Sequence, residues 1–138
     1  MPAWAHGLLN EARVGHLATT TRTGIPAIVP VCFVFSHGLV YTPIDEKPKI
    51  VESTKLRRIR NIHENPQVAF IVDEYNENWR NLRHVILFGR ATIITAGTEH
   101  GRIISLLRMK YSQYKAMRLE ERPVVRIKPL RVKVWKPT

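Results

Sequence analysis

The sequence has little cysteine, little acid and no long apolar run: one Cys, and 11 Asp and Glu against 22 Lys and Arg in 138 residues. A single thiol, Cys32, excludes an intrachain disulfide and fits a reducing compartment. No apolar stretch approaches the ~20 residues of a membrane-spanning helix. Residues 1–6 carry no basic segment before a long apolar one, so no secretory signal is expected. We therefore expect one cytoplasmic domain spanning residues 1–138.

The scarcity of acidic residues leaves a formal net charge of +11, and this charge is unevenly placed. Cations are concentrated in residues 47–60 and again in residues 108–138, whereas residues 1–46 carry few. Such asymmetry favours an anionic partner, which here means nucleic acid, a phosphorylated cofactor or an acidic surface.

A basic segment, residues 53–62, has the spacing of an amphipathic helix. Leu56, Ile59 and Ile62 share one arc and can dock on the rest of the protein, because residues three apart lie on one helix face. Neighbouring cations repel by a few tenths of a kcal/mol per pair, and a bound anion would relieve that repulsion. The free N–H groups of the first turn also suit phosphate. The alternative is a solvated basic face.

Hydrophobic periodicity predicts a mainly β protein with helices. Apolar spacing predicts helices over residues 3–13, 53–62 and 98–118, and strands over residues 14–21, 26–36, 39–42, 67–74, 82–95 and 124–135. Pro30 predicts a bulge or an edge position in its strand, and Gly89 predicts a bulge or bend. In the last strand, alternation predicts one apolar face that includes Leu130 and Val132. Six hairpin-connected strands predict an antiparallel barrel with helices packed on it.

Several short motifs, in this order, resemble the pyridoxamine 5'-phosphate oxidase-like family of flavin-binding split β-barrels. They are Val14–Thr19, Gly24–Val31, Tyr41-Thr42, Arg57-Arg58, Asn65-Pro66, Phe88-Gly89 and Val132–Trp135. The stretches Tyr41–Pro48 and Leu56–Ile62 are most similar to the branch that uses the deazaflavin coenzyme F420. The resemblance implies a six-stranded split barrel, a homodimer with cofactor sites at the subunit interface, and hydride-transfer chemistry.

The resemblance also implies the residues that bind the cofactor. The backbone along the tricyclic ring would be Pro30, Val31, Cys32 and Phe33. Tyr41 and Thr42 would contact the phosphate region, and Arg57 and Arg58 would bind the phosphate. His84 stands where the family places a Gln that reaches the cofactor from the other subunit. Pyridoxamine phosphate oxidases carry Arg where this chain has Val29-Pro30, and their Arg-x-His motif does not follow Trp135, so a different reaction is expected.

Further side chains complete the expected site. Asn61 lies on the same helix arc as Arg57 and Arg58, and Lys47 and Lys55 would serve a longer anionic tail such as the polyglutamate of F420. Trp79, in the loop of residues 75–81, is a candidate to stack on the cofactor. No cation adjoins Cys32 in sequence, so we expect a small buried residue rather than a nucleophile. The histidines lack ligand spacing, and no metal site is predicted.

Three functions remain open from the sequence. The first is an F420-dependent oxidoreductase that reduces a small unsaturated substrate, with FMN as the alternative cofactor. The second is a protein that holds flavin or F420 without turnover. The third, and the least favoured, is a nucleic-acid-binding protein, since no helix-turn-helix, zinc or RNA-recognition motif accompanies the charge. Membrane association is not expected.

Overall fold

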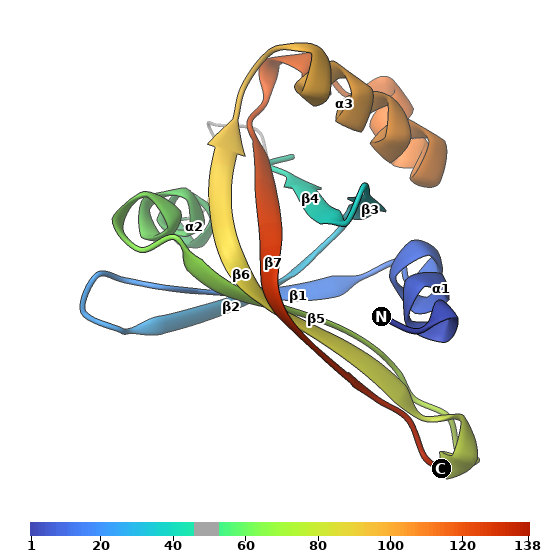
Figure 1. Ribbon diagram of the computed structural model, residues 1–138. Coiled ribbons are helices and arrows are strands. Elements are labelled where there is room, and N and C mark those ends of the chain that lie inside the picture. Colours follow the sequence, from blue (N-terminus) through green and yellow to red (C-terminus); the bar gives the residue numbers. More distant parts are fainter. Residues whose placement is uncertain (46–52) are drawn as a thin grey trace.

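A computed structural model describes residues 1–45 and 53–138, with the side chains of α2 described from residue 57 onward. Figure 1 shows a strongly curled sheet with helices around it. The helices are α1 (Ala3–Glu11), α2 (Ser53–Glu64) and α3 (Thr98–Lys110), with short 3₁₀ turns η2 (Trp79–Asn81), η3 (Ser112–Ala116) and η4 (Leu119–Glu121). The strands are β1 (Gly15–Thr20), β2 (Pro26–Val31), β3 (Val34–Ser36), β4 (Leu39–Pro43), β5 (Gln67–Glu74), β6 (Arg83–Ile94) and β7 (Val124–Trp135).

The described strands form one antiparallel sheet whose order is β2-β1-β5-β6-β7-β4-β3. Strands β2 and β3 lie at opposite edges, yet only Cys32 and Phe33 separate them in the chain. A flat sheet would place these edges about 29 Å apart, at about 4.8 Å per strand. The connection from Val31 to Val34 spans at most roughly 10 Å. The sheet therefore curls until its edges meet, which produces a half-barrel.

The mainly β, antiparallel split-barrel prediction is confirmed, but the predicted six strands are seven. The expected strand over residues 26–36 divides at Cys32 and Phe33, because its two halves pair with different partners, β1 and β4. At the break, the backbone N–H of Phe33 donates to the hydroxyl of Tyr111 at 3.0 Å instead of to a strand. A side chain from beyond α3 thus satisfies the backbone at the point of closure.

The predicted helix over residues 98–118 is shorter than expected, since α3 ends at Lys110. Tyr111 has extended backbone geometry, and its hydroxyl lies 2.8 Å from the carbonyl oxygen of Arg13 and 3.1 Å from that of Phe33. The chain leaves the helix here because this side chain is directed into the seam of the barrel. A 3₁₀ turn, η3, follows.

Two strand irregularities are confirmed. Pro30 lies in an edge strand, where the missing N–H costs no ladder bond on the open side. The register between β6 and β7 shifts between Phe88 and Gly89. A Cβ at Gly89 would stand 2.2 Å from the carbonyl oxygen of Lys128, so only glycine allows the two backbones to approach this closely.

Apolar side chains form two cores. The larger fills the inside of the curled sheet under α1 and α2, and includes Leu9, Leu17, Phe33, Phe70 and Leu87. The smaller lies between α3 and the strands β3, β4 and β7, and includes Tyr41, Ile103, Leu107 and Val124. The two cores meet near the break between β2 and β3, so α3 covers the end of the barrel (Figure 1).

The final strand departs from its predicted pattern. Val125 and Ile127 are fully buried, but Leu130 is 64% exposed and Val132 is 42% exposed. Figure 1 shows that the ends of β5, β6 and β7 run beyond the body as an arm, which comprises residues 73–84 and 135–138. Leu130 falls at the register shift between Pro129 and Arg131 and has no partner residue in β6.

Replacing Tyr111 by Phe tests the closure of the barrel. The variant removes the acceptor for the Phe33 N–H and leaves a part-buried donor unsatisfied. We expect a loss of about 1–3 kcal/mol in the free energy of unfolding, measured by urea denaturation. Tyr75→Phe is the matched control, because Tyr75 is 65% exposed. An equal, small effect in both variants would contradict this role of Tyr111.

Candidate functional site

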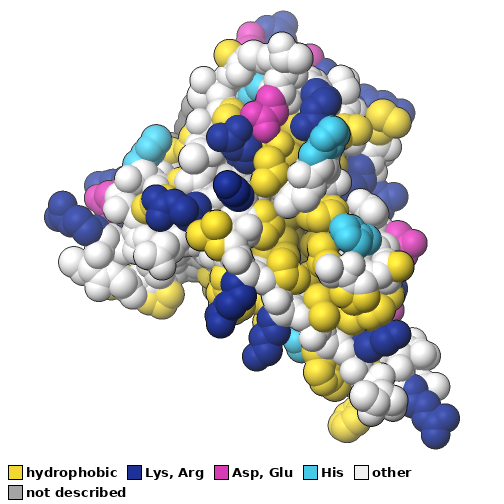
Figure 2. All heavy atoms as spheres, in the orientation of Figure 1, with side chains coloured by type: hydrophobic (Ala, Val, Ile, Leu, Met, Phe, Trp, Pro, Cys, Tyr) yellow, Lys and Arg dark blue, Asp and Glu magenta, His cyan; other side chains and the backbone are white. Residues whose placement is uncertain are grey.

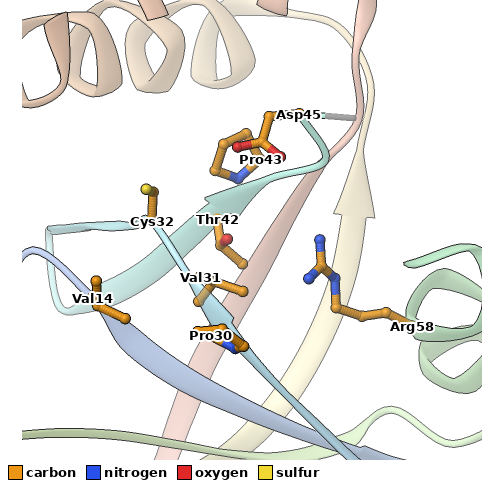
Figure 3. A pocket seen from close by; sticks show the side chains of 8 residues that line it. All are labelled: Val14, Pro30, Val31, Cys32, Thr42, Pro43, Asp45 and Arg58. Carbon is orange, nitrogen blue, oxygen red and sulfur yellow. The ribbon is translucent and has the colours of Figure 1, made fainter. Parts of the chain in front are cut away.

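A pocket of about 220 Å³ opens at the seam of the half-barrel. It lies between the end of β2, the end of β4 and helix α2, as Figure 3 shows. The lining residues are Val14, Pro30, Val31, Cys32, Thr42, Pro43, Asp45 and Arg58. The lining residues come from β2, β4 and α2 and from the segments that adjoin β1, β2 and β4, and the curl of the sheet brings them together.

Arg58 forms one end of the pocket. It is only 3% exposed, and Figure 3 shows its guanidinium reaching from α2 toward the strands. Two contacts hold α2 against the sheet: Ile62 is buried in the larger core, and Asn61 Nδ2 donates to Thr19 Oγ1 of β1 at 3.1 Å. A guanidinium held in this way can donate two parallel hydrogen bonds to a phosphate or carboxylate.

Thr42 stands on the pocket wall between the strands. The residue is fully buried, and its Oγ1 has no hydrogen-bond partner among the described residues. An unsatisfied buried hydroxyl costs about 1–3 kcal/mol, so a ligand oxygen or nitrogen at this point would be stabilising. A buried cation and an unsatisfied hydroxyl in one pocket, beside the apolar Pro30 and Val31, fit the phosphate and ring of a phosphorylated cofactor.

The opposite end of the pocket holds Cys32 and Asp45, on the side nearer α3 (Figure 3). The hydroxyl of Tyr114 donates to Asp45 Oδ2 at 2.6 Å. Burial, followed by the Asp45 carboxylate, raises the pKa of Tyr114. The phenol therefore stays protonated and holds the carboxylate in place.

Lys110 lies behind this end of the pocket. Its Nζ donates to the carbonyl oxygen of Phe33 at 3.0 Å and stands 3.9 Å from the centre of the Phe33 ring. Burial, and then the charge of Arg13, lower the pKa of Lys110 to about 8, while electrostatic interaction with Cys32 acts in the other direction. Burial also raises the pKa of Tyr111 to about 12.

Five of the predicted cofactor residues meet in the pocket: Pro30, Val31, Cys32, Thr42 and Arg58. Three others point elsewhere. Successive strand residues face opposite sides, so the Tyr41 hydroxyl donates to Glu99 Oε2 at 2.5 Å, beneath α3. Phe33 packs edge-on against Phe70 in the core. Asn61 uses its amide to hold α2 to β1.

The predicted cations of α2 have different placements. Arg57 is exposed, while the next residue, Arg58, is buried, because one step along a helix turns the side chain by about 100°. Lys55 lies in α2, but its side chain is not among those described. Lys47 lies outside the described residues.

Trp79 and His84 belong to the arm. Trp79, in η2, is 67% exposed, and the ring of His84 stacks on Trp135 with centroids 5.6 Å apart. Neither residue lines the pocket of its own chain.

Sequence reasoning missed Val14, Pro43 and Asp45 in the lining and Lys110 and Tyr114 behind it. Pro43, the last residue of β4, and Asp45 lie within three residues of Thr42, so their place in the chain could have pointed to them. Lys110 and Tyr114 are more than 60 residues from their hydrogen-bond partners, Phe33 and Asp45. No local pattern signals these contacts.

Comparison with known proteins identifies the family. The pyridoxamine 5'-phosphate oxidase family model matches residues 1–136. The chain belongs to this family. No curated protein sequence matches it significantly.

Solved structures with the same fold bind different groups. A FAD-binding protein from Mesorhizobium loti is 22% identical to this chain, with a TM-score of 0.72. The match covers 100% of this chain and 96% of the FAD-binding protein. An F420 reductase is also 22% identical to this chain, with a TM-score of 0.68. The match covers 96% of this chain and 98% of the reductase chain. The heme storage protein HutZ from Vibrio cholerae is 18% identical to this chain, with a TM-score of 0.70. The match covers 91% of this chain and 87% of the HutZ chain.

No group of three or more His, Cys, Asp or Glu side chains suited to a metal ion occurs in residues 1–45 and 53–138. None of the described helices combines the length and the apolar character that crossing a bilayer requires. The pocket at the barrel seam is the candidate site.

Proposed function

We propose that the protein binds a phosphorylated flavin-type cofactor in the seam pocket and uses it for hydride transfer to a small unsaturated substrate. Coenzyme F420 is the proposed cofactor and FMN the alternative. The observation that carries the proposal is the pairing of the buried Arg58 guanidinium with the unsatisfied Thr42 hydroxyl beside an apolar strand. Membership of the pyridoxamine 5'-phosphate oxidase family supports it.

The pocket chemistry supports one orientation of the proposed cofactor. Arg58 and Thr42 would hold phosphate oxygens, since a guanidinium and a hydroxyl both suit them. The tricyclic ring would lie along Pro30, Val31 and Cys32, at the end of an edge strand whose outer backbone groups pair with no other described strand. Those groups can hydrogen-bond the polar edge of the ring.

Hydride chemistry places few demands on the protein. The cofactor supplies the redox reactivity, while the chain binds it, orients it and excludes water. The absence of an acid–base pair from the predicted site residues is compatible with this division of work. Cofactor binding without turnover would use the same pocket, and only turnover separates the two functions.

We also propose a homodimer with the cofactor at its interface. A volume of about 220 Å³ is below the roughly 300–1,000 Å³ of most ligand pockets, so one chain forms only part of a site. Leu130, Val132 and Trp135 are exposed apolar residues on one strand, as an interface would require. On the face in Figure 2, hydrophobic side chains gather over the centre, with Lys and Arg around them. In a dimer, Trp79 and His84 on the arm would be free to approach the other pocket.

Conservative substitutions test the contributions of Arg58 and Arg57 to cofactor binding separately. Arg58→Lys keeps the charge but loses bidentate geometry, and a charge-assisted hydrogen bond contributes about 1.5–3 kcal/mol. We expect the Kd for F420 or FMN, measured by fluorescence titration, to rise about 10- to 100-fold. Arg57→Lys, on the exposed face, should change it less than about 3-fold. Micromolar binding of neither cofactor by the wild-type protein would contradict the proposed function.

The dimer has its own test. Leu130→Asp combined with Val132→Asp places two charges on the exposed strand, where burial of an unpaired charge opposes association. We expect the wild-type chain to have twice the monomer mass in size-exclusion chromatography with light scattering, and the variant to dissociate. Met109→Asp, at a site 81% exposed on α3, is the matched control and should remain dimeric. A monomeric wild-type protein would refute the dimer.

A further inference from the structure

A second pocket, of about 380 Å³, lies where the end of α3 meets the segment between α1 and β1. Its volume falls within the roughly 300–1,000 Å³ of small-molecule sites. It shares no lining residue with the seam pocket. Four of its eight lining residues are cations and none is acidic, so we call it the basic pocket. The four cations are Arg13, Arg108, Lys110 and Lys115.

One of these cations, Arg108, is already neutralised. Its guanidinium donates to both carboxylate oxygens of Glu120. It also donates to the carbonyl oxygens of Tyr114 and Met117. Arg108 therefore ties the chain that follows α3 back to the helix, and we assign it no ligand.

The other three cations of the basic pocket, Arg13, Lys110 and Lys115, form no ion pair with a residue that the structure describes. The Arg13 guanidinium donates to the carbonyl oxygen of Lys110, and Lys110 Nζ donates to that of Phe33 at 3.0 Å. Both acceptors are neutral, and a guanidinium has five N–H donors and an ammonium three, so donors remain for a ligand. The negative end of the α3 dipole is equivalent to roughly half an elementary charge, which does not balance three cations.

Two of the cations converge on the same aromatic ring. The guanidinium carbon of Arg13 lies 5.7 Å from the centre of the Tyr111 ring, and Lys110 Nζ lies 5.3 Å from it. Burial, and next the charge of Arg13, lower the pKa of Lys110 to about 8. The fold thus holds a part-buried ammonium beside a second cation, and a bound anion would offset their repulsion.

We propose that the basic pocket binds a small polyanion, which is a molecule with phosphate groups or clustered carboxylates. Arg13 and Lys110 would hold the anionic oxygens, because a guanidinium and an ammonium both form charge-assisted hydrogen bonds with them. Ser112, Gln113 and Lys115 are exposed at the rim and can contact the rest of the molecule. A concave site with three cations fits a compact ligand, whereas a nucleic-acid backbone requires cations along an extended groove.

This site is independent of the proposed cofactor, since its cations take no part in the seam pocket. Failure of the protein to bind F420 or FMN would therefore leave the basic pocket untouched. Failure of the polyanion to bind would likewise leave the seam pocket untouched.

Lysine acetylation of the cofactor-free, wild-type full chain tests the proposal without any variant. The chain is treated with N-acetoxysuccinimide at pH 7 and constant ionic strength, with and without inorganic pyrophosphate, and with citrate in a parallel arm. Peptide mass spectrometry gives the rate at each lysine. We expect at least one polyanion to slow the acetylation of Lys110 about 5-fold or more, because a bound anion covers the amine and favours its protonated form. Lys128, which is exposed on β7, is the internal control and should change less than about 1.5-fold.

Pyrophosphate protection alone would assign a phosphate ligand, and citrate protection alone a polycarboxylate. Either result supports a polyanion site. No protection of Lys110 by either compound, or equal protection of Lys110 and Lys128, would overturn the proposal.

Charge-removing variants test which cations bind. Isothermal titration calorimetry is performed in the Arg58→Met background, so that the seam pocket cannot supply the anion site. Arg13→Met combined with Lys110→Met should raise the Kd for the protecting polyanion about 10-fold or more. Lys128→Met combined with Lys133→Met removes the same charge from exposed positions of β7 and should change the Kd less than about 2-fold. An equal effect of the two pairs would refute the site, and circular dichroism verifies that each variant is folded.

Discussion

The structure depends on a two-residue connection. Cys32 and Phe33 join strands that lie at opposite edges of a seven-stranded sheet, so the sheet must curl until those edges meet. The hydroxyl of Tyr111 accepts from the Phe33 N–H, and Lys110 donates to the Phe33 carbonyl oxygen. The helix end that covers the barrel thus supplies the hydrogen bonds that neighbouring strands supply elsewhere.

The same closure forms the candidate site. When the edges meet, the end of β2 faces the end of β4, and α2 brings the buried Arg58 against both. One end of the pocket is cationic and the other carries a thiol and a carboxylate. A ligand with an anionic group and a conjugated ring matches this polarity, which is why a phosphorylated flavin-type cofactor is the proposed occupant. Some of the basic residues form ion pairs away from the pocket, as in the pairs Arg108–Glu120 and Arg126–Glu99.

Much of the fold could be predicted from local patterns, because period-2 alternation and turn residues act over a few positions. Pro30 at an edge and Gly89 at a bulge are examples. The break at Cys32 could not be predicted from local patterns. The residues on both sides of Cys32 are apolar, and the strand divides there because its two halves pair with different strands, β1 and β4. For the site, Thr42 and Arg58 followed from family resemblance, whereas Tyr41 is directed away from the pocket by strand alternation. Lys110 reaches the Phe33 carbonyl oxygen, and Tyr114 reaches Asp45, only through tertiary packing.

The central claim is that the barrel seam holds a phosphorylated cofactor between Arg58 and the end of β2. A crystal structure of the protein grown with F420, and with FMN in a parallel experiment, tests it most directly. The account predicts phosphate oxygens within hydrogen-bond distance of the Arg58 guanidinium and Thr42 Oγ1, with the ring along Pro30, Val31 and Cys32. A cofactor bound elsewhere, or crystals in which the seam stays empty with both cofactors at saturating concentration, would contradict it.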